Sequence, residues 1–235
     1  MSVGCGPLIS RQHTQQCLQV GAMTVLLSYG ISIRQFHFCT WWMSALKLNG
    51  ASVCTIRTKA NVCCVQFPPD SARFLAFGSA DHRIYYYDIR NLQMPLCTLV
   101  GHNKTVSYIK FVDTVNLVSA STDNTLKLWD LSMCASRVID SPIQSFTGHM
   151  NVKNFVGLSV SDGYIATGSE TNEVFIYHKA FPMPALSFKF QNTDPNSGHE
   201  VDDAAQFVSS VCWRGQSSTL LAANSTGNVK ILEMV

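Results

Sequence analysis

The chain has 235 residues, of which 46% are hydrophobic and 14% are charged. This composition excludes an intrinsically disordered protein, and the length suffices for a domain with its own hydrophobic core. The formal net charge of +2 gives no basis for direct nucleic-acid binding, which usually needs a concentrated basic face.

The N-terminal part of the chain and the cysteines bear on the cellular compartment. Residues 20–33 are the most apolar run, but about 14 residues fall short of the ~20 that a membrane helix needs. The preceding residues lack the basic start of a secretory signal, so a buried segment is favoured over a cleaved or anchoring one. The nine cysteines are scattered, odd in number and without a Cys-x-x-Cys pair. We interpret them as reduced, mostly buried thiols inside a cell.

An internal repeat is the main signal in the sequence. Four segments share an apolar pair, a run of small residues, a polar turn and an alternating strand: residues 75–88, 117–130, 165–178 and 221–233. Their strands close on the large apolar residues Tyr87, Trp129, Tyr177 and Leu232. These residues are about 42 to 55 positions apart, and WD40 repeats are about 40–45 residues long, so the longer intervals require loop insertions.

Each repeat is expected to contain four strands. In the clearest unit these are residues 106–111, 117–121, 126–129 and 143–146, separated by Gly, Asn, Asp, Ser and Pro. A further strand is expected at residues 207–213. Four strands per unit with no helical stretch predict an all-β fold, a WD40 β-propeller rather than a sandwich.

The same unit carries four polar positions that are typical of a WD40 blade. His102, Ser119, Asp123 and Trp129 are expected to form a structural tetrad, because a buried imidazole needs a partner for each nitrogen. The set is incomplete in the other units: no Gly-His precedes Val62, Thr171 replaces the Asp, and Tyr87, Tyr177 and Leu232 replace the Trp.

The domain organisation is predicted as an atypical segment, residues 1–50, followed by a partial propeller, residues 51–235. We count four units where WD40 rings usually have about seven. Residues 46–48 could be the last strand of an earlier blade. The expected fold is therefore incomplete, with an open sheet edge that is exposed to aggregation or covered by a partner.

Several strings in the chain go beyond a generic WD40 match. They are residues 59–67, 77–91, 101–112, 121–132, 151–180 and 209–235, and together they resemble the C-terminal WD40 region of the plant SPA family, the suppressors of phytochrome A signalling. The related constitutively photomorphogenic ubiquitin ligase is similar but less close. The resemblance implies a nuclear adaptor that represses photomorphogenesis. Its implied partners are this ligase, a cullin-4 adaptor, and transcription factors or photoreceptors with Val-Pro motifs.

The resemblance also implies a site for docking on the cullin-4 adaptor. Tyr87, Asp88 and Arg90 match the Trp-Asp-x-Arg motif of WD40 proteins, with Tyr in place of Trp. An exposed guanidinium could pair with an acidic partner. The alternative is an Asp–Arg pair that only closes the turn. The second such position, at residues 129–132, lacks the Arg and is expected to be structural.

A peptide-binding surface is the second implied site. His82, Lys104 and Phe155 match the surface on which the related ligase reads Val-Pro peptides, although Val152 replaces an acid there. An aromatic wall and a lysine suit such peptides. The alternatives are strand packing for Phe155 and a solvated loop charge for Lys104. The arginine and tryptophan of that pocket belong to blades beyond the four units.

The sequence gives no indication of catalysis, a cofactor or a metal. No nucleophile or carboxylate constellation stands out, and the glycine-rich loop, His-Arg-Asp and Asp-Phe-Gly of kinases are absent. The acidic run at residues 199–203 suits no standard metal site and is expected to be a loop. The rival to an adaptor is a truncated propeller that is non-functional or competes with full-length relatives.

Overall fold

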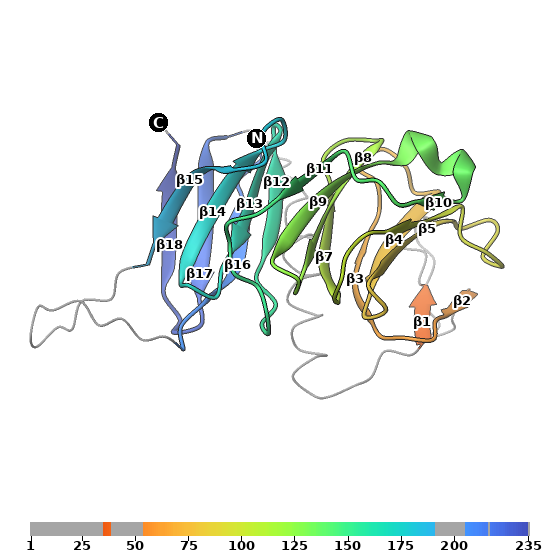
Figure 1. Ribbon diagram of the computed structural model, residues 1–235, viewed down its shortest axis with the longest axis horizontal. Coiled ribbons are helices and arrows are strands. Elements are labelled where there is room, and N and C mark those ends of the chain that lie inside the picture. The colour runs from red at the N-terminus through yellow and green to blue at the C-terminus, as the bar shows by residue number, and fades with distance from the viewer. Residues whose placement is uncertain (1–34, 39–53, 191–204, 216, 235) are drawn as a thin grey trace, which may run out of the picture. The chain divides into compact units, whose positions relative to one another are not determined.

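The computed structural model describes residues 35–38, 54–190, 205–215 and 217–234 (Figure 1). They belong to one compact unit, Arg34–Val235, whereas a second unit, Met1–Ile33, lies outside the described residues. The predicted boundary between residues 50 and 51 and the possible strand at residues 46–48 also lie outside them. The regular structure described is almost entirely β-strand.

The first repeat forms a sheet of five strands. A two-stranded sheet, β1 (Gln35–Phe38) with β2 (Cys54–Arg57), precedes it in the chain. The repeat itself contributes β3 (Val62–Gln66), β4 (Phe74–Ser79), β5 (Arg83–Asp88) and β6 (Cys97–Val100), paired antiparallel in that order. The fifth strand, β10 (Val138–Ile139), comes from the next repeat and pairs parallel with β6.

The remaining repeats form three more antiparallel sheets. The second contains β7 (Val106–Phe111), β8 (Asn116–Ser121), β9 (Thr125–Asp130) and β11 (Gln144–Phe146). The third contains β12 (Leu158–Ser161), β13 (Tyr164–Gly168), β14 (Glu173–His178) and β15 (Pro184–Lys189). The fourth contains β16 (Val208–Trp213), β17 (Thr219–Asn224) and β18 (Val229–Glu233). The predicted all-β architecture of four repeated units is confirmed.

The repeat read from the sequence recurs in the strand geometry. Tyr87, Trp129, Tyr177 and Leu232 are each the penultimate residue of the third strand in their sheet. The first strands β3, β7 and β16 each shift register near their start, between Val62 and Cys64, Val106 and Tyr108, and Val208 and Ser210. A bulge at a fixed position bends the strand and increases its twist in the same way in these three repeats.

Neighbouring sheets bury each other face to face. The first strand of each sheet contacts the first strand of the next, in the order β3, β7, β12 and β16. One apolar cluster joins the second sheet to the third and includes Leu126, Phe146, Leu158 and Ile165. A second cluster joins the third sheet to the fourth, with Val174, Ile176, Trp213 and Leu220. Because a sheet is apolar on both faces here, each one depends on its neighbours for burial.

The expectation of no helical stretch is wrong at one connection. A short 3-10 helix, η1 (Leu131–Ser136), follows β9. The Asp130 carboxylate accepts a hydrogen bond from the Ser132 amide at 2.8 Å and so caps the first turn. Asp130 and Ser132 belong to the stretch that the sequence predicted to be structural.

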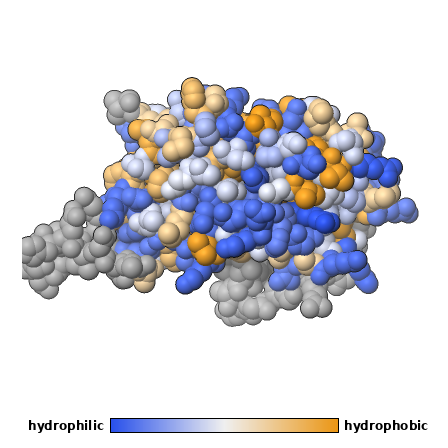
Figure 2. Space-filling view, in the orientation of Figure 1, coloured by the Kyte–Doolittle hydropathy of each residue, from blue (hydrophilic) through white to orange (hydrophobic). Residues whose placement is uncertain are grey.

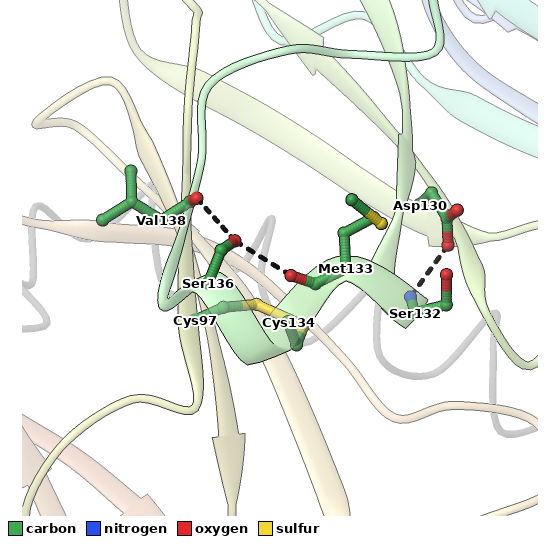
Figure 3. Close-up of a disulfide and its surroundings, with 7 residues drawn as sticks. All are labelled: Cys97, Asp130, Ser132, Met133, Cys134, Ser136 and Val138. Carbon is green, nitrogen blue, oxygen red and sulfur yellow. Dashed lines mark hydrogen bonds between the residues drawn. A yellow bond between two sulfur atoms is a disulfide. The ribbon is translucent and has the colours of Figure 1, made fainter.

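The interpretation of every cysteine as a reduced thiol is also wrong for two of them. Cys97, at the start of β6, forms a disulfide with Cys134 in η1 (Figure 3). The Cα atoms are 5.2 Å apart, within the usual range for a disulfide. The two residues are 37 positions apart, and only the contact between the first and second repeats brings them together. Cys63 and Cys64 are free thiols.

The sheet-to-sheet core predicts a large effect of removing one ring. Phe146 is fully buried between the second and third sheets, so Phe146→Ala should lower the free energy of unfolding by about 3–5 kcal/mol. Phe181→Ala, at an exposed ring, should change it by no more than about 0.5 kcal/mol. Chemical denaturation measures both. Equal effects of the two substitutions would contradict the packing.

Candidate protein-docking site

A hydrogen-bonded chain of four side chains organises the second sheet. His102 Nδ1 lies 3.0 Å from Asp123 Oδ2, and His102 Nε2 lies 2.7 Å from Ser119 Oγ. Trp129 Nε1 donates to Ser119 Oγ at 2.8 Å. The structure thus brings together all four residues of the expected tetrad. They tie the β6–β7 connection to strands β8 and β9.

The electrostatics of this tetrad favour a neutral imidazole beside a charged carboxylate. Burial lowers the pKa of His102, and Asp123 opposes this shift. Burial acts to raise the pKa of Asp123, but hydrogen bonds from His102, Thr125 and the Asn103 amide outweigh it and hold that pKa well below its usual range.

The third sheet has a reduced version of the same arrangement. His149 Nδ1 lies 3.1 Å from the Tyr177 hydroxyl, and within the described residues His149 Nε2 has no hydrogen-bond partner. Thr171, which stands in the Asp position, donates to Glu173 instead. Burial lowers the pKa of His149 to about 4. This imidazole is therefore neutral at physiological pH.

The predicted adaptor-docking residues lie where β5 ends and the connection to β6 begins. We call this the Arg90 end of the sheets. Asp88 Oδ2 accepts from Arg90 Nη2 at 2.9 Å and from Arg73 Nη2 at 2.8 Å. The Asp88 side chain is 9% exposed, whereas that of Arg90 is 63% exposed. The alternative of a turn-closing Asp–Arg pair is thus present, and the guanidinium still faces solvent.

The third residue of this set does not lie at the surface. Tyr87 is buried and stacks on Phe77, with ring centroids 5.7 Å apart. Burial raises the pKa of its hydroxyl. Tyr87 therefore supports the strand end from within the core of the first sheet, and Arg90 is the exposed member of the motif.

The predicted peptide-binding residues lie at the opposite end, which we call the His102 end. His82 is in the β4–β5 turn, Lys104 is in the β6–β7 connection, and Phe155 is in the β11–β12 connection. His82 and Lys104 are exposed, and Phe155 is partly buried. The Phe155 ring packs edge-on against Tyr108 at 6.2 Å, so strand packing accounts for part of its environment. The structure places the three residues on connections of one end.

The connection that carries Phe155 is held by a single carboxylate. Glu170 Oε1 accepts hydrogen bonds from the amides of Val152, Lys153 and Asn154 at 2.6–3.0 Å. Burial acts to raise the pKa of Glu170, but these amides outweigh it and lower that pKa. The Glu170 carboxylate therefore holds this loop in place. Val152, which stands where the related ligase has an acidic residue, takes part through its backbone amide.

Sequence reasoning did not identify Arg73. It precedes Asp88 by 15 positions, and its Nε also donates to Asp88 Oδ2 at 2.9 Å. The antiparallel register of β4 with β5, which pairs Phe74 with Asp88, creates this neighbour. The hairpin pattern was visible in the sequence and could have suggested an interaction between Arg73 and Asp88.

The described residues contain no helix with the length and apolar character to cross a bilayer. Over the same part of the chain, no group of three or more His, Cys, Asp and Glu side chains could hold a metal ion. Residues 20–33 and the acidic run at residues 199–203 lie outside this part of the chain.

Comparison with known proteins identifies the repeats. The family model "WD domain, G-beta repeat" matches residues 50–88 and 93–130, which are the first two repeats. Among solved structures, Raptor from Chaetomium thermophilum has a TM-score of 0.64 at 15% identity and covers 78% of this chain and 17% of its own. The computationally designed Ika4 protein has a TM-score of 0.57 at 18% identity and covers 76% of this chain and 94% of its own. These likenesses concern the fold.

Comparison of sequences shows which WD40 proteins are similar to this chain. Protein SPA1-RELATED 3 of Arabidopsis thaliana is 75% identical over 187 residues, which is 80% of this chain and 22% of the relative. Protein SUPPRESSOR OF PHYA-105 1 of the same plant is 59% identical over 187 residues, or 78% of this chain and 18% of the relative. The resemblance to the SPA family is confirmed. The E3 ubiquitin-protein ligase COP1 of Arabidopsis thaliana is 48% identical over 182 residues, covering 77% of this chain and 26% of the relative. The SPA-type WD40 region described here thus spans about a quarter or less of the length of these relatives.

The tetrad predicts a specific loss of stability. Ser119→Ala leaves His102 Nε2 and Trp129 Nε1 without their buried partner, so the free energy of unfolding should fall by about 2–4 kcal/mol. Ser187→Ala, at an exposed position of β15, should cost no more than about 0.5 kcal/mol. Urea denaturation compares the two variants. A loss for Ser119→Ala as small as that for the control would contradict the tetrad.

His149 predicts a pH dependence of stability. Its pKa is about 4 in the folded chain and 6.5 as the ordinary value, so between these values the unfolded state binds more protons. The contribution of neutral His149 to the free energy of unfolding is present above pH 6.5 and is lost as the pH falls to 4. It amounts to about 3 kcal/mol, because one pKa unit corresponds to about 1.4 kcal/mol.

Denaturation curves between pH 4 and 7 measure this dependence. His149→Gln should flatten the decrease in the free energy of unfolding as the pH falls. The decrease that remains is assigned to His102, whose pKa burial also lowers, and to carboxylates with lowered pKa values such as Asp123 and Glu170. The same slope in the variant and the wild type would rule out the assignment to His149.

Proposed function

We propose that this chain acts as an SPA-type adaptor of a ubiquitin-ligase assembly that represses photomorphogenesis in the plant nucleus. The 75% identity to Protein SPA1-RELATED 3 carries this proposal. WD40 repeats are a non-catalytic interaction module, and the SPA and COP1 relatives give that module its context. The COP1 relatives are ligases by name, so the catalytic step belongs to the partner.

The Arg90 end is proposed to dock on the cullin-4 adaptor. Asp88 holds the Arg90 guanidinium in a bidentate pair, with Nε at 3.1 Å from Oδ1 and Nη2 at 2.9 Å from Oδ2. This contact fixes the direction of a side chain that is otherwise long and mobile. An exposed guanidinium in a fixed position can form a charge-assisted hydrogen bond with a partner carboxylate.

The His102 end is proposed to contact Val-Pro motifs of transcription factors or photoreceptors. Phe155, supported by Tyr108, offers an apolar wall for the Val-Pro pair. Lys104 and His82 are exposed and can meet acidic flanking residues. The two proposed sites lie at opposite ends of the sheets, which leaves room for both partners at once.

A binding experiment with the purified cullin-4 adaptor tests the adaptor role. The wild-type chain should bind, and Arg90→Ala should weaken binding about tenfold through loss of the charged contact. Arg83→Ala is the matched control, because Arg83 is also exposed but lies at the start of β5, at the other end of the sheet. Biolayer interferometry gives the Kd values.

Two results would contradict the adaptor role. If the wild type does not bind, the chain has no direct route to cullin-4. A chain that binds COP1 but not the adaptor, and that displaces full-length SPA protein, would instead be the competing scaffold. If Arg90→Ala and Arg83→Ala weaken binding equally, docking does not use the Arg90 end.

A further inference from the structure

At the Arg90 end, the group formed by Arg73, Asp88 and Arg90 has more positive than negative charge. Arg73 and Arg90 both pair with the single carboxylate of Asp88, and guanidinium groups stay protonated in proteins. The three side chains therefore have a net charge of +1. The Asp88 side chain is 9% exposed, whereas Arg73 is 48% exposed. Asp88 thus holds two guanidiniums in place. Their outer N–H groups remain in solvent and can donate hydrogen bonds to a second carboxylate.

Apolar side chains lie on the connections next to this charge. Met94 and Leu96 belong to the β5–β6 connection, which also contains Arg90, and Met94 is 55% exposed. Met133, which is 60% exposed, and Val138, which is 54% exposed, come from η1 and β10. Figure 2 shows orange apolar side chains at the edge where Figure 1 places η1 and β10. Exposed Met next to Arg is typical of protein interfaces rather than of free surface.

The two connections are fastened to each other. The Cys97–Cys134 disulfide joins the residue after Leu96 to the residue after Met133. The Thr98 amide donates to the Arg137 carbonyl at 2.9 Å, and Val138 pairs with Thr98 in the sheet.

Within η1 and β10, the Ser136 hydroxyl contacts the carbonyls of Met133 and Val138, each at 2.9 Å (Figure 3). Apolar side chains of two repeats are therefore held in one place before any partner binds. This arrangement lowers the entropy cost of docking.

We infer that these side chains form one docking surface for a protein segment that presents a carboxylate beside apolar residues. We call it the β5–η1 surface, and it consists of Arg73, Arg90, Met94, Leu96, Met133 and Val138. The partner carboxylate bridges the two guanidiniums, and its apolar neighbours pack on the methionines. The inference rests on the proposed adaptor role and adds Arg73 and the η1 residues, which no Trp-Asp-x-Arg pattern contains.

The charge and the apolar area together select this occupant. A nucleic acid or phosphate-rich ligand would need more cations than the net +1 of the Arg73–Asp88–Arg90 group and would gain nothing from exposed methionines. A purely apolar partner would desolvate two guanidiniums that share the single carboxylate of Asp88, so one positive charge would be buried without a counter-charge. A mixed acidic and apolar segment satisfies both parts of the surface.

Binding of the purified cullin-4 adaptor to variants of the full chain tests the surface. Arg73→Ala and Met133→Ser should each raise Kd about fivefold to tenfold, and Arg73→Lys should have an intermediate effect because the charge remains. Arg83→Ala and Met150→Ser are matched controls at the His102 end, both exposed, and should stay within about twofold of the wild type. Arg73→Ala should also reduce the dependence of Kd on salt.

The outcomes separate this inference from the adaptor role. If the wild type binds and Arg90→Ala weakens binding, but Arg73→Ala and Met133→Ser match their controls, the β5–η1 surface is wrong and the adaptor role stands. If the wild type does not bind, both are wrong. Thermal unfolding shows whether each variant remains folded. If Arg73→Ala unfolds, the Kd of Arg73→Lys, which keeps the ion pair with Asp88, is compared with that of the wild type instead.

Discussion

Close packing of one sheet on the next is the constraint on which the rest of this structure depends. It shows most clearly at three glycines on strands or connections that face a neighbouring sheet. A Cβ atom on Gly78 would lie 2.6 Å from Val106 Cγ1, and one on Gly157 would lie 2.6 Å from the Val211 amide nitrogen. A Cβ atom on Gly168 would overlap the Val208 carbonyl. The absence of a side chain at these points lets neighbouring sheets approach closely enough to exclude water from the faces between them.

Because the sheets pack as consecutive repeats, the features that lie within one repeat could be predicted from the sequence. Alternation along a strand and a large residue near its end are local, so the C-terminal end of the third strand in each repeat was predicted to within one residue. The His102, Ser119, Asp123 and Trp129 positions were predictable because all four lie within one repeat, at positions that are typical of a WD40 blade. The order of the sheets followed from the repeat itself, since consecutive units stack on each other.

What the sequence did not reveal depends on contacts between repeats. The pairing of β10 with β6, the disulfide between Cys97 and Cys134, and η1 all arise where the second repeat crosses the edge of the first. Cysteine spacing carries no information about such a contact. Arg73 differs from these cases, because its contact with Asp88 lies within the first repeat and follows from the register of β4 with β5. Tyr87 was expected at a docking site, but the end of β5 is buried, and the Tyr87 ring packs against Phe77 inside the first sheet.

The two ends of the sheets have different chemistry, and this difference shapes the functional proposals. At the His102 end, hydrogen bonds between His102 and Ser119 and from backbone amides to Glu170 fix short connections, and the exposed groups include His82 and Lys104. At the Arg90 end, longer connections expose methionines beside two guanidiniums that share one carboxylate. A rigid support with two unlike surfaces suits an adaptor that holds one protein while presenting another.

A double-mutant cycle across the boundary between two sheets tests the central claim most directly. Tyr86 of β5 and Phe111 of β7 belong to the first and second sheets, and their ring centroids are 6.5 Å apart. If the sheets pack as described, Tyr86→Leu and Phe111→Leu should show a coupling free energy of about 0.5–1.5 kcal/mol in urea denaturation. Strict additivity, within about 0.3 kcal/mol, would mean that the two rings do not meet and that neighbouring sheets do not bury each other.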